Sequence, residues 1–151
     1  MMEIKDCPTW ISAVASVVSA LGVFFTYWQV RIIRAQAVTQ FEDDLDREYR
    51  QIISHLPACA ILGKPLTTQE YEANKERLLA YIDLSNQQVF YRKCKRITDL
   101  TWESWRIGIQ TNLTSPAFSE AWREIKDNTP HYEELRRLEK GMFRNDPVTW
   151  T

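Results

Sequence analysis

An uncharged run near the N-terminus is the longest feature of the hydrophobic pattern. Residues 7–30 contain no Asp, Glu, Lys or Arg, and most of them are apolar. A helix that crosses a membrane needs about 20 such residues, because it rises ~1.5 Å per residue through a hydrocarbon core of ~30 Å. The pattern therefore predicts a transmembrane helix over residues 9–30, preceded by a short external segment, residues 1–8.

Aromatic and basic residues stand at the ends of this run. Trp10 lies at one end, and Tyr27 with Trp28 at the other. Along a helix the two levels are ~27 Å apart, close to the spacing of the two membrane interfaces, where Trp and Tyr concentrate. Arg31 and Arg34 follow directly, and we expect them to reach the lipid headgroups.

Two other interpretations of the run remain open. A secretory signal peptide would have a basic first segment, a shorter apolar core and a small-residue cleavage site. Here the first seven residues are of mixed charge, and two arginines separate the core from Ala35-Gln36-Ala37, so cleavage is disfavoured. A buried helix of a soluble protein would not need aromatic residues at both ends.

The basic residues predict the orientation. Only Lys5 precedes the run, whereas Arg31, Arg34, Arg47 and Arg50 follow it. Because loops rich in Lys and Arg stay on the cytoplasmic side, we expect the N-terminus outside and the C-terminal domain in the cytoplasm.

The predicted span has a bulky face and a face of small, mildly polar residues. The small face is formed by Ser12, Ser16, Ser19, Ala20 and Thr26. Small residues let helices approach closely in lipid, and hydroxyls can form hydrogen bonds across helices. This face predicts a homo-oligomer or contact with other membrane-protein subunits, in addition to membrane lipids. A serine-lined pore is a narrower hypothesis, and a plain anchor with hydroxyls bonded to its own helix is the alternative.

Apolar residues in the rest of the chain recur every three or four positions, which is typical of helices. No stretch alternates as a strand would. The fold class predicted is all-α: the membrane helix continues over 31–56, a small antiparallel helical domain follows over 67–143, and residues 144–151 form a loosely held tail. Start and stop signals set these limits, namely Pro57, the pair Thr67 and Glu70, Thr98, Ser115-Pro116, Thr129-Pro130 and Gly141.

Large aromatic residues mark the core of this domain. Trp102, Trp105, Phe118 and Trp122 fall on helix faces at helical spacing. They could stack on a ligand ring, but the spacing favours the core, where each aromatic side chain buries ~150–250 Å².

Charge and composition exclude some function classes. The net charge of −1 argues against nucleic acid as a partner of the whole chain. Three distant cysteines, without a histidine at ligand spacing, predict neither a disulfide framework nor a metal site. No phosphate-binding loop or other cofactor motif is present, so we expect no cofactor. The acidic residues Asp43, Asp44, Asp46 and Glu48 are expected to form a solvated face, and the basic residues 91–96 to complement a helix C-terminus.

Several spaced residues in the second half carry a resemblance. They are Asn86 and Phe90, Arg96-Ile97, Trp102, Trp105, Gly108-Ile109, Pro116, Phe118, Ala121-Trp122 and Ile125. This pattern resembles a widespread group of small bacterial proteins that have one N-terminal membrane helix and a cytoplasmic helical domain. The layout is more distantly similar to the membrane accessory protein of Cas13b-type CRISPR systems, an oligomeric pore used in phage defence. The resemblance implies the bacterial inner membrane, oligomerisation and antiviral defence.

One pair of residues raises the question of an enzyme. Arg50 and His55 have the Arg-x4-His spacing of HEPN-type ribonucleases, in which a histidine acts as acid or base and an arginine holds phosphate. Such pairs also arise by chance, and a histidine just before a helix end complements the helix dipole. The sequence thus favours a non-enzymatic membrane protein that acts by self-association or as a scaffold subunit. A membrane-permeabilising defence effector and a membrane-tethered ribonuclease are the alternatives.

Overall fold

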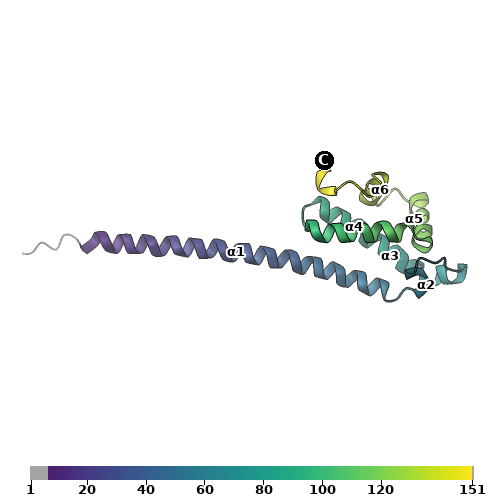
Figure 1. Ribbon diagram of the computed structural model, residues 1–151, viewed down its shortest axis with the longest axis horizontal. Coiled ribbons are helices and arrows are strands. Elements are labelled where there is room, and N and C mark those ends of the chain that lie inside the picture. The colour runs from purple at the N-terminus through teal and green to yellow at the C-terminus, as the bar shows by residue number, and fades with distance from the viewer. Residues whose placement is uncertain (1–6, 151) are drawn as a thin grey trace, which may run out of the picture. The chain divides into compact units, whose positions relative to one another are not determined.

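All secondary structure in the described part of the chain is helical (Figure 1). The structure is a computed structural model that describes the backbone of residues 7–150 and side chains from residue 12 to 150. The elements are α1 (Cys7–Ile53), α2 (Ala58–Ile61), α3 (Thr68–Lys93), α4 (Asp99–Thr114), α5 (Pro116–Asn128), α6 (Glu133–Lys140) and a 3-10 helix, η1 (Pro147–Thr149). The predicted all-α fold class is confirmed, including one long apolar helix that could span a membrane.

The chain divides into two compact units, which meet within α1. The N-terminal unit comprises residues 1–39, and the helical domain comprises residues 40–151. In the N-terminal unit, every described side chain from residue 12 to 37 is exposed. The helical domain, in contrast, has a continuous apolar core. The last turns of α1 belong to this core, since Leu45 is buried in it.

The C-terminal end of α1 differs slightly from its predicted end. The sequence predicts a helix to residue 56, but α1 ends at Ile53. Pro57 disfavours helical backbone in the residue before it. The chain therefore leaves the helix through a turn in which the Leu56 amide donates to the Ile53 carbonyl oxygen, at 3.0 Å. The short α2 follows in a stretch that the sequence predicts to be a break.

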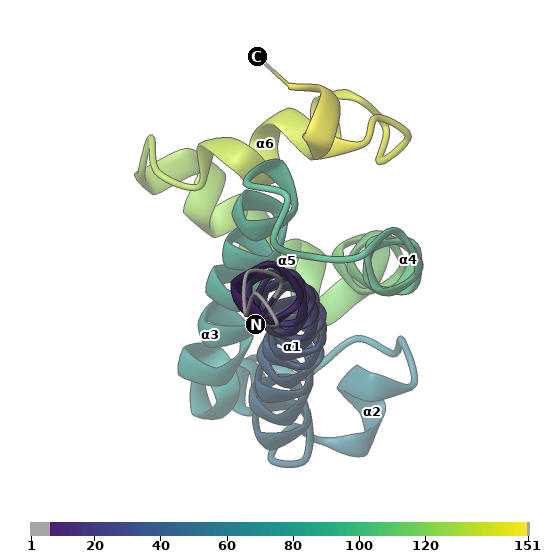
Figure 2. The same ribbon diagram turned by 90° about the vertical axis from the view of Figure 1, so that its left-hand side faces the viewer.

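Helix α3 is the centre of the domain. It packs against α4, α5, α6 and η1, and Figure 2 shows α3 next to α5. Its buried apolar positions follow helical spacing. They are Tyr71, Leu78, Tyr81, Ile82, Leu84 and Val89.

The predicted start signals are correct for α3 and α4 but wrong for α6. Thr67 and Glu70 form a reciprocal capping box at α3, and the Thr98 hydroxyl accepts from the Thr101 amide at α4. The pair Thr129-Pro130 does not start the last helix, because α6 begins only at Glu133, after Tyr132 in a left-handed conformation. Thr129 instead accepts from the His131 amide, at 3.1 Å, in a turn.

The prediction of a loosely held tail over 144–151 is wrong for its described residues. Asp146 accepts from Nε of Arg92 at 2.8 Å, and Pro147 is buried against the domain in η1. Arg92 is itself only 5% exposed, and it also donates to the Ile97 carbonyl oxygen. A buried guanidinium must be paired to be tolerated. Asp146 of the C-terminal segment supplies this partner, so its ion pair with Arg92 of α3 holds the segment against the domain.

Candidate functional site

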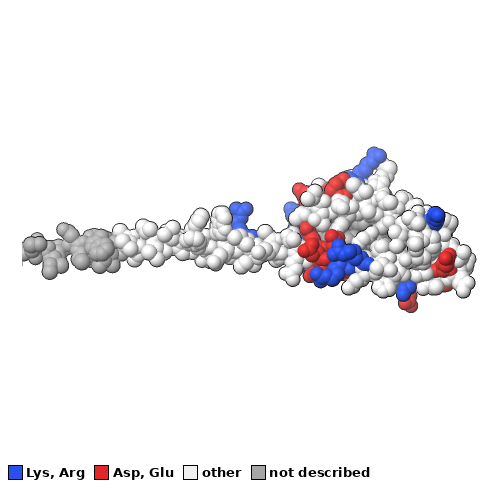
Figure 3. Space-filling view, turned by 60° about the horizontal axis from the view of Figure 1, so that its bottom comes forward, with Lys and Arg blue, Asp and Glu red and all other residues white. Residues whose placement is uncertain are grey.

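The described N-terminal unit carries a continuous apolar surface. Its large apolar side chains are each more than two-fifths exposed: Val14, Val17, Val18, Leu21, Val23, Phe24, Phe25, Tyr27, Trp28 and Val30. On the face seen in Figure 3, this stretch shows no charged side chain before the first arginines. Such a surface needs lipid or protein against it, because water does not solvate it favourably.

The predicted interface anchors lie at the C-terminal end of this surface. Tyr27 and Trp28 are 62% and 58% exposed, and Phe24 contacts Trp28 with ring centroids 6.2 Å apart. Arg31 and Arg34 lie one and two turns beyond. The side chain of Trp10, the anchor predicted at the other end, lies outside the described residues.

The hydroxyl groups of the small face form hydrogen bonds within their own helix. Ser16 donates to the Ser12 carbonyl oxygen at 2.9 Å, and Ser19 donates to the Ala15 carbonyl oxygen at the same distance. Thr26 makes the same kind of bond to Gly22, at 2.8 Å. These hydroxyl donors are already used within the helix. Together with Ala20, the face therefore offers small side chains for close packing and not free hydroxyl donors for a neighbouring helix.

Two acidic residues of α1 hold the start of α4. The Glu42 carboxylate accepts from the Thr98 amide at 2.6 Å and from the Thr101 hydroxyl at 2.8 Å. Asp46 accepts from the indole N–H of Trp105 at 2.8 Å. The expected solvated acidic face is thus wrong for Asp46, which is half-buried. Its neighbours Asp43, Asp44 and Glu48 are exposed as expected.

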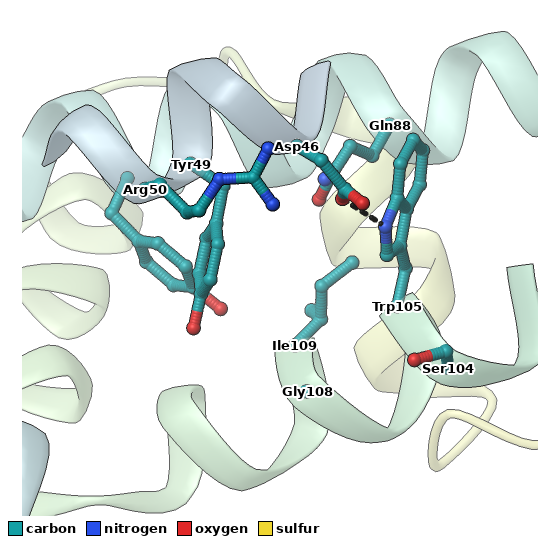
Figure 4. A pocket seen from close by; sticks show the side chains of 9 residues that line it. Asp46, Tyr49, Arg50, Gln88, Ser104, Trp105, Gly108 and Ile109 are labelled. Carbon is teal, nitrogen blue, oxygen red and sulfur yellow. Dashed lines mark hydrogen bonds between the residues drawn. The ribbon is translucent and has the colours of Figure 1, made fainter. Parts of the chain in front are cut away.

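A cavity of about 290 Å³ opens beside this contact, between α1, α3 and α4 of the helical domain (Figure 4). Aromatic and aliphatic side chains form much of its wall, and a few polar groups reach into it. The lining residues are Asp46, Tyr49 and Arg50 from α1, Tyr81 and Gln88 from α3, and Ser104, Trp105, Gly108 and Ile109 from α4.

Gln88 is the unusual member of this cavity. The residue is only 5% exposed, and its amide, which lines the cavity, forms no hydrogen bond with another described residue. Figure 4 shows the end of this side chain in the same space as the side chains of Arg50 and Asp46. The guanidinium of Arg50 is exposed and likewise has no ion pair within the described chain.

Two tyrosines form one side of the cavity. The rings of Tyr49 and Tyr81 lie with centroids 6.2 Å apart. Burial raises the pKa of the Tyr81 phenol to about 12, although a hydrogen bond from Asn112, at 2.9 Å, acts in the opposite direction. This hydroxyl therefore stays protonated at neutral pH and is available only as a hydrogen-bonding group.

The structure does not bring the predicted ribonuclease pair together in this cavity. Arg50 lines it, whereas His55 does not and lies exposed beyond the end of α1. Nδ1 of His55 is 2.7 Å from the Gln51 carbonyl oxygen, so this nitrogen carries the proton and donates locally.

No protein family, curated protein or solved structure matches this chain. Within the described residues, no group of three or more His, Cys, Asp or Glu side chains is placed to hold a metal ion.

The aromatic residues predicted as core divide into two groups. Trp102, Phe118 and Trp122 are at most 2% exposed. Trp105 is only partly buried, because its indole lies at the cavity and bonds to Asp46. The Trp122 indole N–H has no hydrogen-bond partner in the described chain, and the cations of Lys126 and Arg136 lie over its ring.

The basic segment 91–96 is built into the domain. Arg92 is buried, Lys93 pairs with Glu134 at 2.8 Å, and Arg96 lies 4.5 Å over the ring of Phe41. Three of these cations therefore have partners inside the domain, which leaves little of the segment to act as a free basic patch.

The cavity residues that the sequence does not single out are Tyr49, Tyr81, Gln88 and Ser104. Gln88 does carry a signal, since it lies three positions after Ser85 and four before Arg92, on the inward face of α3. Polar residues at core positions of an amphipathic helix need a partner. This periodicity would have marked Gln88 as a residue to explain.

Proposed function

We propose that this chain is a single-pass protein of the bacterial inner membrane that holds a cytoplasmic helical domain at the bilayer. It acts by association, either with a second copy of itself or with other subunits of a membrane complex. One observation carries the proposal: residues 12–37 form a single helix whose apolar side chains are all exposed.

The size of this surface favours lipid over water as its environment. Burying a large apolar side chain is worth ~1.5–3 kcal/mol. Ten of them, partly exposed, lie between Val14 and Val30, so their transfer out of water contributes on the order of 10–20 kcal/mol. This is as large as the total stability of ~5–15 kcal/mol that is typical of a domain. A helix with such a surface is therefore expected to be in lipid.

The length and the flanking charges fit the same placement. The uncharged residues 7–30 would extend ~36 Å as a helix, enough to cross a hydrocarbon core of ~30 Å with some tilt. Arg31 and Arg34 follow the apolar surface, which favours the cytoplasmic side for the domain.

Close packing supports the association part of the proposal. Ser12, Ser16 and Ala20 are four residues apart and share one face of α1. A small residue at every fourth position lets two helix backbones approach closely. Since the Ser16 and Ser19 hydroxyls bond to their own helix, side-chain size is expected to matter more than the hydroxyl itself.

Membrane insertion is tested by alkaline carbonate extraction of membranes from cells that express the chain. We expect the protein to stay in the pellet, and a Leu21→Arg variant to be released. Labelling of the exposed Cys94 with a membrane-impermeant maleimide, in a variant whose Cys7 and Cys59 are replaced by serine, tests the orientation: labelling only after the membrane is opened supports a cytoplasmic domain. Wild-type protein in the carbonate supernatant would contradict a spanning helix.

Association is tested by native mass spectrometry of protein extracted with its lipids. We expect an oligomer that Ser16→Leu weakens and Ser16→Ala preserves, because only leucine obstructs close approach. Val18→Leu, on the bulky face, is the matched control and should leave the oligomer intact. A monomer in all four samples would remove self-association and leave a heteromeric complex to be tested by co-purification.

A further inference from the structure

The cavity between α1, α3 and α4 has two polar groups that nothing in the described chain satisfies. Gln88 is only 5% exposed as a residue, and its amide lines the cavity without a hydrogen bond to another described residue; the Arg50 guanidinium is exposed without an ion pair. A ligand that enters the cavity can therefore form the hydrogen bonds that the protein does not supply to these two groups. We propose that this cavity binds a purine nucleoside monophosphate.

The walls favour a planar ring. Tyr49, Tyr81 and Trp105 all line the cavity, and Figure 4 shows the Tyr49 ring and the Trp105 indole on opposite sides of the central space. Aromatic walls with a few convergent polar groups are the usual form of a small-molecule site. A volume of about 290 Å³ is at the lower end of such sites, which restricts the ligand to a small one.

The polar side chains of Gln88 and Asp46 restrict which hydrogen-bonding groups the edge of that ring can carry. A glutamine amide presents a donor beside an acceptor and pairs with the edge of a purine that presents the opposite pattern. Asp46 uses one carboxylate oxygen for the Trp105 indole, and its second oxygen can accept from an exocyclic amine of the base. Both groups therefore suit a neutral base that carries N–H donors.

The charges place the anionic end of the ligand at Arg50. A carboxylate at Asp46 disfavours an anion beside it, whereas the exposed guanidinium of Arg50 attracts one. Arginine binds phosphate through two parallel hydrogen bonds. The base is thus inside the cavity and the single phosphate at its rim.

Space for the ligand is left at Gly108 on the floor. A Cβ atom built there has no heavy atom within 4 Å. An alanine at this position would therefore cause no clash, and its methyl group would occupy part of the cavity. Gly108→Ala is consequently a variant that blocks the site while keeping the fold.

The experiment is calorimetric titration of the detergent-solubilised full-length protein with adenosine monophosphate, adenosine and inorganic phosphate. We expect the monophosphate to bind with a dissociation constant below 1 mM, roughly the weak end of specific binding, adenosine at least tenfold more weakly, and phosphate not measurably. A matched titration with guanosine monophosphate shows which base edge the site prefers.

Variants assign the roles. Arg50→Met should weaken binding of the monophosphate about tenfold, which corresponds to about 1.4 kcal/mol, but leave binding of adenosine unchanged. Arg47→Met is the control, because Arg47 pairs with Asp44 and does not line the cavity. Gln88→Leu and Gly108→Ala should abolish binding of both, with melting temperatures at or above that of the wild type. Absence of binding by every purine tested, or binding that survives both Gln88→Leu and Gly108→Ala, would overturn the proposal.

Discussion

Aromatic side chains are treated in opposite ways in the two units of this chain. Phe25 and Trp28 in the N-terminal unit are 62% and 58% exposed, whereas Phe118 and Trp122 in the helical domain are 1% and 2% exposed. The residue types are the same and so is the secondary structure. The difference shows that amphipathicity, and not aromatic content, decides which helices bury their aromatic residues in a core: the domain helices have charged faces, whereas residues 7–30 contain no charged residue.

The largest difference in stability is expected between two matched substitutions, one in each unit. Phe118→Ala removes a ring that lies 4.7 Å from that of Tyr81 in the core, and we expect it to lower the unfolding free energy of the domain by about 3–5 kcal/mol. Phe25→Ala should leave that free energy unchanged, since its ring contacts no core residue. Urea unfolding in detergent, followed by near-UV circular dichroism, measures both. Equal losses in the two variants would break the comparison.

The next effect concerns polar groups, which also differ between the units. Arg92 is buried and holds Asp146 of the C-terminal segment. Arg92→Met should destabilise the domain by about 2 kcal/mol, because it leaves a half-buried carboxylate without its cation. Arg123→Met, an exposed arginine on α5, is the control. Limited proteolysis should also cut the Arg92→Met variant within residues 144–150. Resistance of this segment to the protease in the variant would show that the ion pair does not hold it against the domain.

The same ion pair predicts a dependence on pH. Hydrogen bonds from Arg92 hold the pKa of Asp146 below its ordinary value of 3.8. A carboxyl group with a lowered pKa contributes stability that is complete above its ordinary pKa and is lost as the pH falls through the lowered value. Below pH 4, Arg92→Met should therefore lose less stability than the wild type. Parallel acid titrations of both proteins test this, and identical slopes would contradict it.

Replacing a helical glycine by alanine should have a smaller effect on stability, and the chain offers one such glycine in each unit. Gly22 and Gly108 both lie inside helices, and a Cβ at either position meets nothing within 4 Å. Glycine within a helix costs ~0.5–1 kcal/mol relative to alanine. Gly108→Ala should raise the unfolding free energy of the domain by about that much, whereas Gly22→Ala should not change it. A loss of stability in Gly108→Ala would show that the cavity floor does not have the space described.

The sequence predicts local structure well here and long-range pairing poorly. Thr67 and Glu70 are three residues apart, so their capping box can be read directly from the chain. Arg92 and Asp146 are 54 residues apart, and no local pattern links them, which is why the C-terminal segment was expected to be loose.

The cavity shows a second limit of local patterns. Asp46 and Asp44 stand in the same acidic stretch, yet only Asp46 faces Trp105. The difference depends on the packing of α4 against α1, which composition does not encode. The exposed helix of residues 12–30, in contrast, follows from length and lack of charge alone.

The smallest effect is expected at an exposed polar residue of the domain, where water already solvates the side chain. His55 is exposed, and its Nδ1 contacts only neighbouring groups, the carbonyl oxygen of Gln51 and the hydroxyl of Ser54. His55→Ala should change the unfolding free energy by less than about 0.5 kcal/mol, as surface substitutions generally do. The variant also tests whether the Arg50 and His55 pair forms a ribonuclease. Because His55 does not line the cavity with Arg50, we expect the wild type and His55→Ala to leave a labelled single-stranded RNA equally intact. Cleavage by the wild type that disappears in the variant would show that His55 is required for a ribonuclease activity, and would make the end of α1 a catalytic site as well as a packing one.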